Sequence, residues 1–287
     1  MIDETSSLPL IITFVSDLLF GVKIDNVARQ LGYQIETISS ASDLGDAVPG
    51  IEKKPGEGLF GRLGELMAQL SRRQPALLIF DLSNETIPWQ EWIPALKSSP
   101  ATRAIPILCF GAHVEAKTLK QARSFGADLV VPRSSFSADM PRLITDLAIS
   151  PDFEAAQEAC RQPIAQQALE GIVLLNSGEF FDAHEELEHA WMDDESAGRD
   201  LYRAILQIAV AYLQIERKNY NGAVKMLLRV RKWLAPLPDR CRGVDVARLR
   251  EDTNVLHDAL LELGPENMEA FDWNLRRPVI VKNGAEH

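Results

Sequence analysis

Five short apolar segments, separated by helical stretches, constrain the fold of this chain more than any other feature. The apolar segments span residues 8–15, 33–38, 76–80, 105–110 and 129–131, and the helical stretches span residues 19–31, 63–70, 89–96, 115–125 and 136–148. Short apolar runs are typical of strands buried on both faces, and parallel strands need crossover helices between them. The pattern predicts an α/β domain over residues 1–150, with a five-stranded parallel sheet covered on both faces.

Proline and glycine predict two interruptions of this pattern. Residues 39–61 are rich in glycine, proline, serine and charge, which favours a long loop. Pro94 lies inside the stretch 89–96. Because proline lacks a backbone N–H and its ring clashes with the preceding turn, we expect Pro94 to kink or end that helix.

The pattern changes near Pro151. Strand-like runs stop, and helical periodicity takes over in residues 163–177, 180–192, 199–217, 220–235 and 245–263. The third of these carries an apolar stripe at i, i+3, i+4, i+7 and i+8, which is typical of one buried helix face. The sequence predicts a domain boundary at about 148–162, an all-helical bundle domain over 151–287 and a tail from 271 onward.

The charge balance and the cysteines limit the classes of function. Residues 1–150 carry a net charge of −3 and residues 151–287 carry −8, which disfavours nucleic acid as a partner. The early apolar run at 8–15 is too short to span a membrane and no basic leader precedes it, so we expect a cytoplasmic protein. The three cysteines Cys109, Cys160 and Cys241 are far apart and lack a C-x-x-C spacing. We expect reduced, buried thiols, with neither a disulfide framework nor a zinc site.

Charged side chains follow three of the predicted strands. Asp81 ends the third strand, Asp17 follows the first and Arg133 follows the fifth. The carboxyl ends of parallel strands meet at one edge of the sheet, where ligand sites form. Two acids and a cation at that edge suit Mg²⁺ binding and phosphoryl transfer to a carboxylate. The simpler role for Asp17 is to cap the helix that follows it.

The same residues resemble the receiver domains of two-component response regulators. The resemblance covers residues 9–148 and rests on the segments 11–17, 76–82, 105–108 and 124–128. It implies a flavodoxin-like sheet with strand order 2-1-3-4-5. It also implies that Asp81 stands at the phosphoacceptor position.

Four departures from the receiver pattern bear on phosphotransfer. Only Asp17 remains of the acid pair that holds Mg²⁺, Gly111 replaces a Thr or Ser, Arg133 replaces a Lys, and Val130 replaces the aromatic switch residue. A planar guanidinium does not substitute for a lysine point charge, and one acid holds Mg²⁺ poorly. We predict a pseudo-receiver impaired in phosphotransfer, without a cofactor. A working Mg²⁺-dependent phosphoacceptor in a phosphorelay and an unrelated α/β domain remain alternatives.

The densest group of polar residues in the second domain lies in residues 180–191. His184 and Glu188 share one helix face, and Glu185 and His189 share the adjacent one. The two histidines are five residues apart and therefore do not chelate one metal, and a second Glu-x-x-His copy is absent from the sequence. We expect no metal site.

A buried polar network is the leading interpretation of this group. On the next predicted helix, Arg203 and Gln207 form a polar line beside the apolar stripe. We expect Arg203 to pair with Glu188 and Gln207 to reach His184, because buried polar groups need partners. A ligand site or a catalytic site built on the same residues is the alternative.

This group also carries a second resemblance. The pattern His184-Glu185-x-Leu187-Glu188-x-x-Trp191, with Gln207 on the next helix, is similar to the bacterial helical family known as the domain-of-unknown-function family numbered 309. The resemblance covers residues 165–250. It implies a small helical bundle and a motif, and it implies no reaction.

Charge is segregated along the second domain. Residues 179–200 hold nine acids and one arginine, whereas residues 217–242 hold eight basic residues and one acid. The simplest interpretation is that acidic and basic helices lie side by side and stabilise each other. A docking surface for an acidic protein and a nucleic-acid patch are the alternatives.

Together these features favour a regulatory or adaptor protein that is not an enzyme. We expect a protein partner, and a homodimer through the faces of helices 113–125 and 134–148, as receivers often form. The alternatives are a phosphorylation-controlled response regulator, a metal-dependent or hydrolytic enzyme using His184, Glu185 and Glu188, and a transcription-associated factor using the basic helix.

Overall fold

The computed structural model describes residues 8–45, 61–112, 115–149 and 151–282. Most of the predicted loop 39–61 therefore lies outside the described residues. The chain folds as two compact units, and the passage from one to the other lies at Pro151–Asp152.

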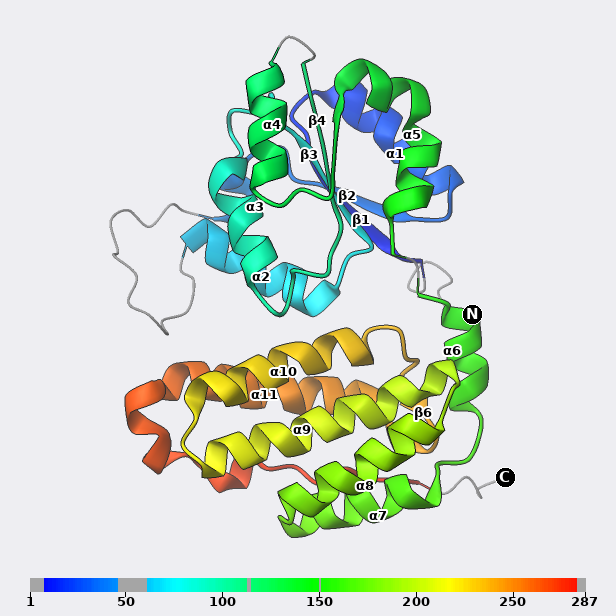
Figure 1. Ribbon diagram of the computed structural model, residues 1–287, viewed down its shortest axis with the longest axis vertical. Coiled ribbons are helices and arrows are strands. Elements are labelled where there is room, and N and C mark those ends of the chain that lie inside the picture. Colours follow the sequence, from blue (N-terminus) through cyan, green and yellow to red (C-terminus); the bar gives the residue numbers. More distant parts are fainter. Residues whose placement is uncertain (1–7, 46–60, 113–114, 150, 283–287) are drawn as a thin grey trace. The chain divides into compact units, whose positions relative to one another are not determined.

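The first unit is a parallel sheet with helices on both faces (Figure 1). Its strands are β1 (Leu10–Phe14), β2 (Gln34–Thr37), β3 (Leu77–Asp81), β4 (Ile107–Gly111) and β5 (Leu129–Pro132). Its helices are α1 (Leu18–Gln30), the 3₁₀ turn η2 (Ala41–Leu44), α2 (Gly61–Arg73), α3 (Trp89–Ser98), α4 (Ala116–Ser124) and α5 (Arg133–Leu147). The strand order β2-β1-β3-β4-β5 confirms the predicted flavodoxin-like topology.

Alternate strand residues supply two separate cores. Helices α1 and α5 cover one face, where Ile11 of β1 packs with Ile24 and Phe136. Helices α2, α3 and α4 cover the other face, where Phe14 packs with Trp92 among other residues. Because β1, β3 and β4 are covered on both sides, their sequences are almost entirely apolar, and this is why they were predictable.

The helix around Pro94 differs from the expectation. Helix α3 continues to Ser98, so Pro94 lies inside it and does not end it. Proline removes one intrahelical hydrogen bond, but Trp89, Trp92 and Leu96 on the same helix are buried against the sheet. Tertiary packing offsets the local cost.

The second unit is helical apart from one short hairpin. Its helices are α6 (Phe153–Cys160), α7 (Gln166–Ser177), α8 (Phe180–Asp193), α9 (Asp200–Glu216), α10 (Tyr220–Leu234) and α11 (Val246–Leu263), with the short 3₁₀ segments η3 (Ala197–Arg199), η4 (Pro265–Ala270) and η5 (Trp273–Leu275) and the strands β6 (Arg240–Cys241) and β7 (Val244–Asp245). Consecutive helices from α7 to α11 pack on one another around a single core. Each of the five helical patterns predicted beyond residue 162 forms a helix.

One helix of this unit was missed and its last segment was predicted wrongly. The boundary region 148–162 contains helix α6, which Asp152 caps by accepting a hydrogen bond from the backbone of Ala155. The predicted tail packs on the unit as far as residue 282. Asn176 exchanges two hydrogen bonds with the backbone of Val279, and Val281 pairs with Val244.

The expectation of three reduced thiols was also wrong. Cys160 at the end of α6 and Cys241 in β6 form a disulfide, and Cys109 is a buried free thiol. The backbone N–H of Arg242 also bonds to the carbonyl of Cys160, so the hairpin is held against α6 beside the sulfurs. The pair is 81 residues apart in sequence, and spacing alone therefore gave no sign of it.

Among the described residues, the longest helices are too short or too polar to cross a lipid bilayer.

Candidate functional site

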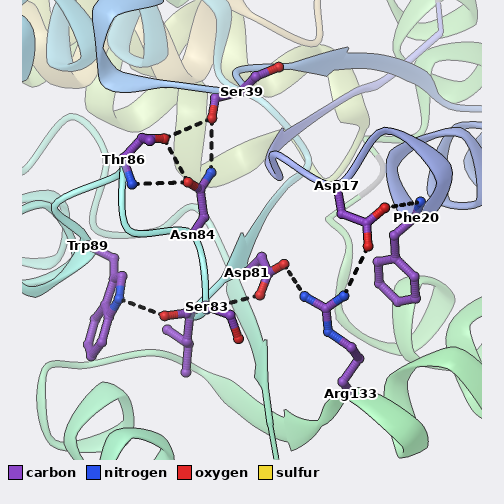
Figure 2. A network of polar contacts seen from close by, with 10 residues as sticks. Asp17, Phe20, Ser39, Asp81, Ser83, Asn84, Thr86, Trp89 and Arg133 are labelled. Carbon is purple, nitrogen blue, oxygen red and sulfur yellow. Dashed lines mark hydrogen bonds and ion pairs between the residues drawn. The ribbon is translucent and has the colours of Figure 1, made fainter.

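The predicted receiver pocket forms at the carboxyl edge of the first unit's sheet. Figure 2 shows Asp81 at the end of β3, Asp17 just before α1 and Arg133 at the start of α5, all turned toward one another. The Asp81 side chain is 3% exposed, whereas the Asp17 side chain is 47% exposed. The structure therefore brings together the two acids and the cation that the sequence placed at one edge.

Arg133 bridges the two carboxylates. Its Nη2 donates to Oδ2 of Asp81, and its Nη1 lies 3.4 Å from Oδ2 of Asp17 (Figure 2). The guanidinium also lies over the rings of Phe20 and Phe110, at 4.9 and 5.3 Å from their centroids. Ion pairs and cation–π contacts together fix the guanidinium between the acids.

Asp17 acts as a helix cap as well. Its Oδ1 accepts a hydrogen bond of 3.1 Å from the backbone N–H of Phe20, which confirms the simpler role expected for this residue. Each of its two carboxylate oxygens is therefore engaged, one by the helix and one by Arg133.

Gly111 ends β4, and the position has little room for a side chain. A Cβ atom there would lie 3.3 Å from Leu119 Cδ2 and 3.3 Å from Leu82 Cβ. Receivers carry a hydroxyl at this position, but here two leucines occupy the space around it. The sequence showed the missing hydroxyl, and it gave no sign of the leucines.

The loop that follows Asp81 is held by a network that sequence reasoning missed. Ser83 donates its backbone N–H to Oδ1 of Asp81 at 3.0 Å. Asn84, which is 2% exposed, and Thr86 both donate to the carbonyl of Ser39 at 3.0 Å (Figure 2). These bonds tie the loop between β3 and α3 to the segment after β2.

The pocket does not fit Mg²⁺. Magnesium takes six oxygen ligands and is usually held by at least one or two carboxylates that are free to face it. Here Asp81 and Asp17 are the two acids of the pocket, and both face the guanidinium of Arg133. Arginine has no acceptor atom and does not lose its charge, so it repels a cation at this place.

The polar motif of the second unit lies on α8. Glu185 is exposed, while His184, Glu188 and Trp191 are half-buried. Arg203 and Gln207 lie on the neighbouring helix α9, and both are half-buried. Among the described residues, no group of three or more His, Cys, Asp and Glu is arranged to hold a metal ion.

The two expected pairings in this motif were wrong. Within the described part of the chain, Arg203 forms no ion pair with Glu188, and the Oε1 atom of Gln207 is buried without a hydrogen-bond partner. Arg203 instead lies between two indole rings, with its Cζ 4.6 Å from the centroid of Trp191 and 3.7 Å from that of Trp233. Trp233 belongs to α10, a third helix. The i, i+3 and i, i+4 spacings within one helix therefore gave no sign of this arrangement.

Acidic and basic segments do not pair as expected. Helices α8 and α10 each pack on α9. Among described residues, the α10 cations Lys225, Arg229 and Lys232 form no ion pair, and in the acidic segment Asp194 pairs with Arg242 of the hairpin at 2.7 Å. The basic face of α10 is therefore not neutralised by α8.

A known family and known structures match separate parts of the chain. Residues 168–226 match the family model described as "Domain of unknown function (DUF309)". Among curated proteins, none matches this chain.

Solved structures similar to the first unit are receivers. The chemotaxis response regulator CheY4 of Vibrio cholerae shares 11% identity at a TM-score of 0.37, covering 49% of this chain and 98% of that chain. A response regulator receiver domain from Bermanella marisrubri shares 20% identity at a TM-score of 0.36, covering 48% of this chain and 96% of that chain. The receiver domain of a histidine kinase from Syntrophus aciditrophicus shares 16% identity at a TM-score of 0.37, covering 48% of this chain and 89% of that chain. The fold itself is established by the strand order described above.

Proposed function

We propose that this chain is a regulatory or adaptor protein whose receiver-like unit does not carry a phosphoryl group, and whose helical unit binds a protein partner. In this proposal residues 1–150 form the receiver-like domain and residues 151–287 form the partner-binding helical domain. One observation carries the first part: Arg133 occupies the space between Asp81 and Asp17 and bonds to both.

The chemistry of phosphoryl transfer explains why this arrangement impairs it. A carboxylate attacks a phosphoryl donor only when cations offset the charge that gathers around the transferred group, and Mg²⁺ does most of this in receivers. Here the guanidinium holds Asp81 Oδ2. The hydroxyl position is Gly111, where Leu82 and Leu119 leave little room. The pocket therefore lacks the metal ligands and the donor that a phosphoryl group would need.

The first test is Mg²⁺ binding, measured by isothermal titration calorimetry on the full-length chain. We expect no saturable binding at millimolar Mg²⁺, because both acids are paired with Arg133. The variant Ser16→Asp with Arg133→Lys restores a second acid and replaces the guanidinium by a point charge, and we expect it to gain Mg²⁺ binding. Adding Asp81→Asn to that variant should abolish the gain. Saturable binding by the unaltered chain, lost on Asp81→Asn, would contradict the proposal.

We also propose that the protein acts in the cytoplasm, as expected for a partner-binding regulator. The Cys160–Cys241 disulfide makes this testable, since disulfides are uncommon in that compartment. Alkylation of thiols in intact cells should find both cysteines reduced there and oxidised after extraction. A disulfide already present in intact cells would favour an oxidising compartment instead.

A further inference from the structure

A row of alternating cations and indole rings crosses four elements of the helical unit, α8, η3, α9 and α10. Trp191 lies between Arg199 and Arg203, whose Cζ atoms are 4.9 and 4.6 Å from its ring centroid. Trp233 lies between Arg203 and Lys232, at 3.7 and 4.7 Å. We call these five residues the tryptophan–arginine ladder.

The ladder has hydrogen-bonding groups without partners. A guanidinium carries five N–H donors, yet Arg203 forms neither a hydrogen bond nor an ion pair with any described residue. The indole N–H groups of Trp191 and Trp233 and the carbonyl oxygen of Gln207, one turn along α9 from Arg203, are buried without a partner. The buried indole and amide atoms lie out of a ligand's reach, whereas the half-buried guanidinium of Arg203 has donors that favour a ligand supplying acceptors.

Positive charge exceeds negative charge around the ladder. Burial lowers the pKa of Arg203, with Asp200 opposing this shift and the charges of Arg199 and Arg229 adding to it. Burial raises the pKa of Asp200, while Arg203, Arg199 and Lys232 oppose that shift. Three cations thus act on the partly desolvated Asp200, and Arg229 adds a further positive charge beside Arg203, so an anion arriving here would meet several cations.

We propose that the tryptophan–arginine ladder is the docking site for an acidic segment, rich in Asp and Glu, of a partner protein. This inference rests on the proposed function, in which the helical unit binds a protein. Carboxylates of the segment pair with the guanidinium of Arg203 and with its neighbours Arg199 and Lys232, since guanidinium and carboxylate form matched, charge-assisted hydrogen bonds.

Charge complementarity favours a peptide over nucleic acid. The domain carries −8 overall, and residues 179–200, which include Arg199 of the ladder, hold nine acids. A long polyanion would lie across this negative surface, whereas a short acidic segment needs only the ladder.

The test is fluorescence anisotropy of a labelled deca-glutamate peptide titrated with the full-length chain at low salt. We expect saturable binding that weakens as salt rises, and about tenfold weaker binding in Arg203→Gln, because one charge-assisted contact is lost. The matched control is Arg217→Gln at the C-cap of the same helix. Arg217 lies 14 residues beyond Arg203, about 21 Å along the axis, and we expect its loss to change binding by about twofold at most. Lys232→Gln, an exposed change that leaves the indoles in place, repeats the test if Arg203→Gln unfolds the unit.

Three results would overturn the inference. The first is that the peptide does not bind at low salt. The second is that Arg203→Gln, Lys232→Gln and the unaltered chain bind the peptide equally well. The third is that a DNA duplex binds more tightly than the peptide. Failure here is separable from failure of the proposed function, because Mg²⁺ binding and phosphorylation at Asp81 are read in the other unit.

Discussion

Reduction of the Cys160–Cys241 disulfide should lower the free energy of unfolding of the helical unit by about 4.5 kcal/mol. The bond closes a loop whose ends are 81 residues apart, and a loop of this length removes much conformational freedom from the unfolded chain. Loss of the bond also weakens the attachment of α6 to the β6–β7 hairpin, leaving the hydrogen bond from the Arg242 N–H to the Cys160 carbonyl.

Amide hydrogen exchange followed by mass spectrometry measures the loss of stability in each unit separately. We expect faster exchange in peptides from α9 and α10 after reduction and in the variant Cys160→Ser with Cys241→Ser. The matched control is Cys109→Ser in the first unit, where burial raises the pKa of the thiol and keeps it unreactive. Unchanged exchange of the helical unit on reduction would show that the bond contributes little.

Replacing Arg133 by alanine should destabilise the first unit by about 3 kcal/mol, because removing one partner of a buried ion pair leaves the other charge unpaired. Asp81 is the buried member, at 3% exposure, and Arg133 is its ion-pair partner. The cation–π contacts with Phe20 and Phe110 are lost as well. Peptides from β3 and β4 should then exchange faster.

A double variant separates the unpaired charge from the lost packing. In Arg133→Ala with Asp81→Asn, no charge is left buried, so we expect a loss of only about 1 kcal/mol. The same loss in the single and the double variant would show that the ion pair is not what stabilises the pocket. Exchange equal to that of the unaltered chain in Arg133→Ala would contradict the bridging role of Arg133 itself.

The fold of the first unit was predictable because its strands are buried on both faces. Parallel pairing forces the ends of β1, β3 and β5 to one edge, so the meeting of Asp17, Asp81 and Arg133 followed from topology alone. The role of Arg133 as a bridge was not predictable. The resemblance to receiver domains implied that Arg133 stands in place of a lysine. Its position between two acids depends on side-chain geometry.

The helical unit was predictable only at the level of its helices. Periodicity located five of them and missed α6, which lies in the segment predicted as the domain boundary. The ladder joins Trp191, Arg203 and Trp233 from three helices, and the disulfide joins residues 81 apart. Such contacts depend on how the helices pack. The distribution of charge along the sequence suggested that acidic α8 lies beside basic α10, whereas both helices pack on α9.

Phosphorylation by a small phosphodonor tests the central claim most directly. The full-length chain is incubated with acetyl phosphate and Mg²⁺, and the product is followed by a phosphate-dependent gel shift and by intact mass, with Asp81→Asn as the control. The account predicts no shift and no added mass, because Arg133 occupies the pocket and Gly111 offers no hydroxyl. A shift in the unaltered chain that Asp81→Asn abolishes would contradict it, and the protein would then be a phosphorylation-controlled switch.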